Sequence, residues 1–86
     1  QTIKEIDKAI KYLSYGTRKL KAEPLVFYYL GSAYHLSYQF DKAIAQYQIF
    51  QTQSAAKLQK EKQIDREIVI CENGLDLVKY TSQLIV

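Results

Sequence analysis

The 86-residue sequence contains no Met or Trp, a single Cys, a single Pro and only three Gly. One cysteine cannot form an internal disulfide bond and has no second thiol with which to build a metal site. No run of about eighteen apolar residues occurs, which argues against a transmembrane helix. The scarcity of Pro and Gly excludes a disordered linker of any length. Since the sequence also lacks a targeting segment and an initial Met, we expect it to be a piece of a longer polypeptide.

Clustered positive charge is missing as well. Lys and Arg outnumber Asp and Glu by 12 to 9, which gives a net charge of +3. The basic residues are scattered among acidic ones, whereas phosphate binding relies on clustered positive charge. We therefore expect neither nucleic-acid binding nor direct membrane insertion. The apolar share of 48% is sufficient for the core of one small domain.

Apolar residues recur at helical spacing along most of the chain. The first such segment, residues 3–20, is followed by Pro24, which suits the first turn of a new helix because an amide proton there would have no intrahelical partner. Further helices are predicted over residues 24–36, 40–53 and 57–79. Only a few residues separate them, so neighbouring helices should pack antiparallel. The fold class is therefore all-α, with about four helices.

An internal repeat predicts how these helices are arranged. The run Asp7-Lys8-Ala9-Ile10 recurs unchanged as Asp41-Lys42-Ala43-Ile44, with the 34-residue period of tetratricopeptide repeats. Phe27, Leu30-Gly31 and Tyr34 match the aromatic-x-x-Leu-Gly-x-x-Tyr pattern of the first helix of such a repeat. We expect antiparallel helix hairpins stacked as a right-handed, tetratricopeptide-like solenoid.

The repeat register divides the single domain, residues 1–86, into three parts. Residues 24–57 form one complete repeat. Residues 3–20 correspond to the second helix of a preceding repeat whose first helix is absent. Residues 58–79 lack the Leu-Gly pair and are interpreted as a long capping helix that closes the array.

The run Tyr29-Leu30-Gly31-Ser32-Ala33-Tyr34-His35-Leu36, followed by Tyr38-Gln39-Phe40-Asp41-Lys42-Ala43-Ile44, resembles a particular family. It is similar to the N-terminal tetratricopeptide region of Bacteroidetes-type OmpA-family proteins. In that family the repeat precedes a β-propeller of PD40 repeats and an OmpA-like peptidoglycan-binding domain, and some members belong to the type IX protein secretion and gliding machinery. The segment Ile70–Lys79 is similar to the helix that leads toward the propeller. The resemblance implies a periplasmic, outer-membrane-associated lipoprotein, in which this piece is a docking arm.

Residues with catalytic potential are isolated from one another in the sequence. No Ser, Cys or carboxylate is placed to complete a triad with His35, the only histidine. Cys71 lies on the apolar stripe of its helix, where a small buried side chain fits better than a reactive thiolate. Glu67 and Glu72 have no second carboxylate that would tune them as an acid and base pair. We expect no enzymatic activity, no metal and no cofactor.

A partner-binding groove is the main functional prediction. In stacked helix pairs the first helices line the concave surface, and aromatic side chains with a polar tip suit such surfaces. The candidate residues on the second and fourth helices are Tyr28, Ser32, His35, Lys62, Arg66 and Val69. We expect this scaffold to bind a protein or peptide partner there. The alternative is that Tyr28 packs on the fourth helix and that the domain is a structural spacer for a downstream propeller.

Self-association is a second possible interaction. In the predicted register, Ile6, Ile10 and Leu13 face the absent first helix of the preceding repeat. Exposed apolar residues of this kind favour association. We therefore expect that a second copy can cover the truncated end.

Overall fold

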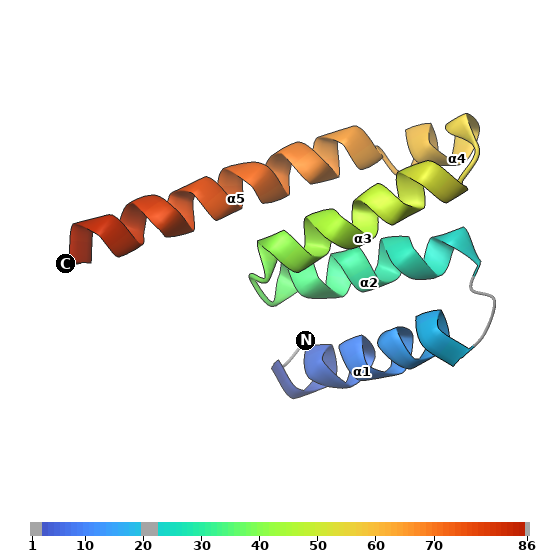
Figure 1. Cartoon of the computed structure of the whole chain (residues 1–86), viewed down its shortest axis with the longest axis horizontal. Helices are drawn as coiled ribbons and strands as arrows, with labels where there is room; N and C mark the ends of the chain where they lie inside the picture. The colour runs from blue at the N-terminus through green and yellow to red at the C-terminus, as the bar shows by residue number, and fades with distance from the viewer. Residues whose placement is uncertain (1–2, 20–22, 86) are drawn as a thin grey trace.

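The computed structural model describes residues 3–19 and 23–85, and in this part of the chain all regular secondary structure is helical, with no strand (Figure 1). The five helices are α1 (Ile3–Lys19), α2 (Pro24–Leu36), α3 (Phe40–Gln53), α4 (Ala56–Glu61) and α5 (Ile64–Ile85). The predicted all-α class is confirmed. About four helices were expected and the described residues form five, for a reason given below.

The four longer helices lie side by side in chain order, and each runs antiparallel to the one before it (Figure 1). Helix α2 packs against α1 and α3, and α3 packs against α5. The short helix α4 connects the end of α3 to the start of α5. Helices α2 and α3 therefore form the centre of the molecule, while α1 and α5 lie at its two ends.

Helix α2 begins and ends where its local chemistry requires. Pro24 occupies the first turn, where its missing amide proton costs nothing. At the other end the amide of Gln39 donates to the carbonyl of Tyr34, and the amide of Tyr38 donates to that of His35. These two bonds define a Schellman motif, in which Tyr38 holds the left-handed position with φ of 62°. Glycine is the usual residue there because a Cβ atom is strained at positive φ.

The predicted boundaries of α2 and α3, residues 24–36 and 40–53, are confirmed. Helix α1 begins at Ile3 as predicted and is described as far as Lys19. The predicted end of the first helix, Leu20, lies outside the described residues.

The prediction of one continuous helix over residues 57–79 is wrong, because the chain turns at Lys62 and Gln63. Gln63 adopts the left-handed conformation with φ of 50°, and its amide donates to the carbonyl of Lys60 at 3.1 Å. The side-chain amide of Gln59 donates to the backbone carbonyls of Gln51 and Ser54, both at 2.9 Å. These bonds hold α4 across the end of α3. Helix α5 then begins in a new direction at Ile64, which is buried.

Helix α5 also differs from the expected solvated cap. Leu77 is 64% exposed, and Val78 and Tyr80 are exposed as well. A capping helix normally presents a polar outer surface. The second half of α5, which extends past the α2–α3 turn in Figure 1, instead carries several large apolar side chains.

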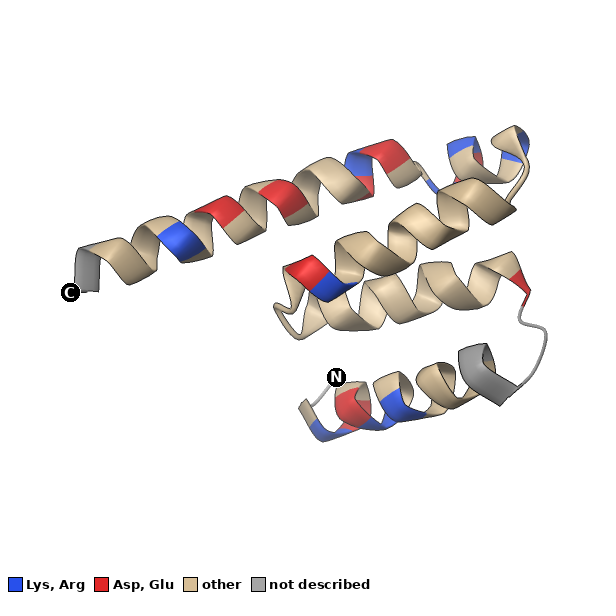
Figure 2. Ribbon diagram, in the orientation of Figure 1, with Lys and Arg blue, Asp and Glu red and all other residues tan. Residues whose placement is uncertain are grey.

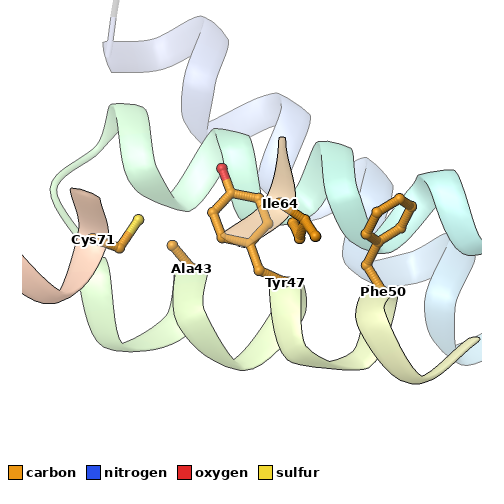
Figure 3. Packing of buried hydrophobic residues seen from close by; sticks show 5 residues of the cluster. All are labelled: Ala43, Tyr47, Phe50, Ile64 and Cys71. Carbon is orange, nitrogen blue, oxygen red and sulfur yellow. The ribbon is translucent and has the colours of Figure 1, made fainter. Parts of the chain in front are cut away.

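The core lies between α2, α3 and α5 (Figure 3). Its central cluster consists of Ala43, Tyr47, Phe50, Ile64 and Cys71. The predicted burial of Cys71 is confirmed, since this side chain is fully buried. No residue of α1 belongs to the cluster as far as the described side chains extend, so α1 is held mainly by its contact with α2.

Two glycines allow the helices to approach closely. A Cβ atom at Gly31 would lie 2.6 Å from the Cδ1 and Cε1 atoms of Tyr47, and one at Gly74 would lie 2.8 Å from the ring of Phe40. These distances are well below van der Waals contact. Gly31 therefore sets the spacing of α2 and α3, and Gly74 sets that of α3 and α5.

Candidate docking face

A lysine held over two tyrosines joins α2 to the turn before α5. The Nζ atom of Lys62 lies 5.3 Å from the ring centroid of Tyr28 and 5.8 Å from that of Tyr29. Both distances are within the range of a cation–π interaction. The structure thus brings together two of the predicted groove residues, Tyr28 and Lys62, and adds Tyr29.

Tyr28 itself is mainly a packing residue. Its ring centroid lies 5.6 Å from that of Phe50 and 5.9 Å from that of Tyr47, and its side chain is half-buried. It therefore packs on α3 and beneath Lys62, which belongs to the predicted fourth helix of residues 57–79, so this part of the alternative prediction holds. This leaves only part of its ring for a partner.

Ser32 lies one turn further along α2. Its hydroxyl donates to the backbone carbonyl of Tyr28 at 3.1 Å and lies 3.3 Å from the hydroxyl of Tyr47. A helical serine that bonds the carbonyl four residues back is common, because the bond satisfies the hydroxyl locally. Ser32 thus links the exposed surface of α2 to the buried phenol of Tyr47.

His35 contacts α5 instead of facing an open groove. Its Nδ1 atom lies 3.7 Å from the Oε2 atom of Glu67, and both side chains are about one quarter exposed. Its ring also packs edge-on against Phe40 at 5.8 Å. When protonated, this histidine forms an ion pair that holds α2 and α5 together.

Arg66 and Val69 are exposed but lie apart from this contact. Arg66 donates to the side-chain oxygen of Gln63 at 3.1 Å. Val69 is two residues from Glu67, so with about 100° of rotation per residue it projects from nearly the opposite side of α5. Ile70, which is also exposed, lies nearer the side of α5 that faces α2. The six predicted residues therefore do not line one continuous surface.

The open surface of α2 is formed by different side chains. Tyr29 is 48% exposed and Leu36 is 56% exposed, with Ser32 between them at helical spacing. A small cleft of about 170 Å³ adjoins this stripe on the side of α1; its lining is Glu5, Ile6, Ala9, Leu13, Tyr29, Ser32, Ala33 and Leu36. We name Tyr29, Ser32 and Leu36 the α2 stripe.

Sequence reasoning missed Tyr29 and Leu36 because it took the direction of the groove from Tyr28. The available signal was their spacing with Ser32, which places all three on one side of α2.

Two buried groups of the core, Tyr47 and Cys71, have raised pKa values. Burial raises the pKa of the Tyr47 phenol from 10.0 to about 12, although its hydrogen bond with Ser32 opposes the effect. Burial also raises the pKa of the Cys71 thiol from 9.0 to about 11, and the charge of Glu67 adds to the increase. Both groups are neutral at physiological pH, so Cys71 is not an activated nucleophile.

Among the described residues, no group of three or more His, Cys, Asp or Glu side chains is positioned to hold a metal ion. The described helices likewise include none that is long and apolar enough to cross a membrane. No family model, curated protein or solved structure matches this chain.

Proposed function

We propose that this domain is a non-catalytic protein-interaction module that binds a peptide or helix of a partner across the α2 stripe. The observation that carries the proposal is the exposure of a tyrosine and a leucine on one side of α2, beside the cleft toward α1. Isolated exposed apolar residues need no explanation, but an aligned pair that borders a concave surface is typical of a binding site.

The chemistry of the face defines the partner. The cleft is lined mainly by apolar groups and is large enough for one aliphatic side chain. Lys62, held over the two tyrosines, contacts no carboxylate in the described part of the chain. A segment with an apolar anchor and an acidic residue nearby therefore fits best, because the ammonium group would gain a charged partner there.

The wider proposal concerns the parent protein. The 34-residue repeat and the antiparallel order of the helices support a tetratricopeptide-like solenoid. With the resemblance of residues 29–44 to Bacteroidetes OmpA-family proteins, we propose a docking arm in a larger periplasmic, outer-membrane-associated protein. The described helices would then present the partner-binding surface, while any peptidoglycan-binding activity would belong to other parts of that protein.

A structural spacer is the second candidate, and one observation favours it. Tyr28 packs on α3, and His35 pairs with Glu67 of α5. Two of the residues that the sequence assigned to a partner therefore stabilise the fold instead. In a spacer, the α2 stripe would be ordinary exposed surface.

Peptide display tests the module directly. A random peptide library is selected on the 86-residue chain, and the recovered peptides are compared for binding to a Tyr29→Ala/Leu36→Ala variant. A control carries Ile3→Ala/Tyr12→Ala on α1, which removes two apolar side chains that are more exposed than Tyr29 and Leu36 and do not line the cleft. Circular dichroism confirms that both variants keep their helical content.

We expect peptides with an apolar residue next to an acidic one, whose affinity falls about tenfold or more in the α2 variant and stays unchanged in the control. A further Lys62→Gln variant should weaken only the acidic peptides. If no peptide is enriched, or if both double variants bind equally well, the stripe is not a docking site and the spacer proposal is favoured.

A further inference from the structure

The outer side of α1 carries a stripe of positive charge. Lys4, Lys8, Lys11 and Tyr15 follow one another at spacings of four, three and four residues, and all four are exposed. The lysines project away from α2, because Lys4 lies two residues from Ile6 and Lys11 lies two from Leu13, both of which line the cleft toward α2. Tyr15 borders a separate cavity of about 250 Å³, which Val26 of α2 also lines. The three lysines have no hydrogen bond or ion pair within the described chain.

Helix α5 carries a stripe of opposite charge at the same spacing. Asp65, Val69, Glu72 and Asp76 are all exposed. Val69 lies nearly opposite Glu67, which contacts α2, so this stripe faces away from α2, and it adjoins α3 at its Asp65 end. Asp65 accepts a hydrogen bond from Gln51, whereas Glu72 and Asp76 have no partner among the described residues.

The two stripes lie at opposite ends of the row of helices. Figure 2 shows that the charged residues concentrate on α1, α4 and α5, while the central helices are almost uncharged. Helix α2 has no Lys, Arg, Asp or Glu, and α3 has only Asp41 and Lys42. Charge is therefore partitioned between the ends of the molecule.

We propose that copies of this chain associate head to tail, with the α1 stripe of one copy packed antiparallel against the α5 stripe of the next. Within one chain, α1 and α5 lie at the two ends of the row of helices and run in opposite directions (Figure 1). If a second copy is shifted along the row without rotation, its α1 therefore lies antiparallel to α5 of the first copy. In this register Lys4 faces Asp76, Lys8 faces Glu72 and Tyr15 faces Asp65, while Lys11 lies over Val69. The partner is a second copy because the two charge patterns of this chain complement each other.

This interface differs from the one predicted by the sequence. Ile6, Ile10 and Leu13 are partly buried rather than uncovered, and two of them line the cleft toward α2. The contact is instead made by charged residues with Tyr15 and Val69 among them. One helix face per copy is less than the ~1,000 Å² that stable interfaces usually bury, so the association is weak and concentration-dependent. Because the two surfaces are different, it produces chains or rings.

Charge exchange tests the proposal on the 86-residue chain. Sedimentation velocity over a range of concentrations compares wild type with Lys4→Glu/Lys8→Glu, with Glu72→Lys/Asp76→Lys and with the fourfold variant that combines them. A control, Lys57→Glu/Lys60→Glu, makes the same change of net charge on two exposed residues of α4. Circular dichroism establishes that each variant is folded.

Wild type should form oligomers that dissociate at high salt. Each double variant should associate about tenfold or more weakly, because attraction becomes repulsion at two ion pairs. The fourfold variant, and an equimolar mixture of the two double variants, should regain association, while the control behaves as wild type. A wild type that stays monomeric at every concentration would overturn the proposal. So would oligomers that the α1 variant leaves intact, or a fourfold variant without recovery.

Discussion

Replacing Gly31 by alanine should destabilise the protein even though alanine is the better helix former. The added Cβ atom would lie 2.6 Å from two ring atoms of Tyr47. That ring cannot move aside easily, because it is 1% exposed and its hydroxyl is held by Ser32. The helices must therefore separate, which loosens the seam between α2 and α3.

The magnitude follows from two opposing effects. Overpacking in a well-packed core costs about 1–3 kcal/mol. The higher helix propensity of alanine than of glycine stabilises the helix by about 1 kcal/mol. The expected net loss of stability is therefore up to about 2 kcal/mol, which corresponds to a fall in Tm of up to roughly 15 °C for a domain of this size. Urea unfolding followed by circular dichroism measures it.

Gly16 on α1 provides the matched comparison. A Cβ atom there would have no neighbour within 4 Å, so Gly16→Ala should stabilise the protein by up to about 1 kcal/mol. Gly74→Ala should fall between the two, because the ring of Phe40 that it meets is only partly buried. If Gly31→Ala stabilises as much as Gly16→Ala, the inferred close approach of α2 and α3 is incorrect.

Three further predictions concern stability. Tyr38→Gly should stabilise by about 1 kcal/mol in urea unfolding, because it relieves the left-handed backbone at an exposed side chain; a loss would mean that the Tyr38 ring contributes more by packing. Between pH 9 and pH 12 stability should fall, because the unfolded chain loses the Cys71 and Tyr47 protons that the folded chain retains. Tyr47→Phe should make the loss of stability between pH 10 and pH 12 smaller by roughly 2 kcal/mol. If stability has the same pH dependence in this variant as in the wild type, the prediction is wrong. Gln59→Ala should lower the free energy of unfolding by about 1–2 kcal/mol, because two backbone carbonyls lose their hydrogen-bond donor. An unchanged midpoint of urea unfolding would show that α4 is held in another way.

The hairpin of α2 and α3 was predictable because several local features of the sequence agree there. Pro24 starts α2, and apolar spacing continues unbroken from Phe40 through α3. The break at Gln63 was not predictable in the same way. Glutamine is a good helix former, and only the bonds of Gln59 to the end of α3, together with the burial of Ile64, make the left-handed turn favourable. A tertiary contact overrides local propensity at that position.

The candidate site was predictable only in part, for a geometric reason. The sequence selected the α2 face that contains Tyr28 and His35, and the packing of α5 covers part of that face. A rotation of about 100° along the helix separates Tyr28 from Tyr29, and the packing of Tyr28 on α3 and beneath Lys62 leaves Tyr29 the more exposed of the two. Periodicity specifies which residues share a face, but it does not specify which neighbour will cover it.

The distribution of charge has a physical explanation that links fold and association. Helix α2 has a neighbour on both sides, so almost every position around it is at least partly buried and an unpaired charge would be costly. Helices α1 and α5 each have a side that faces away from the row, and charge is tolerated there. Opposite charges do border each stripe, since Asp7 lies within one turn of Lys4 and Lys11, and Lys79 lies three residues after Asp76. The aligned stripes, with lysines on α1 and acidic residues on α5 at identical spacing, are the feature that head-to-tail contact accounts for.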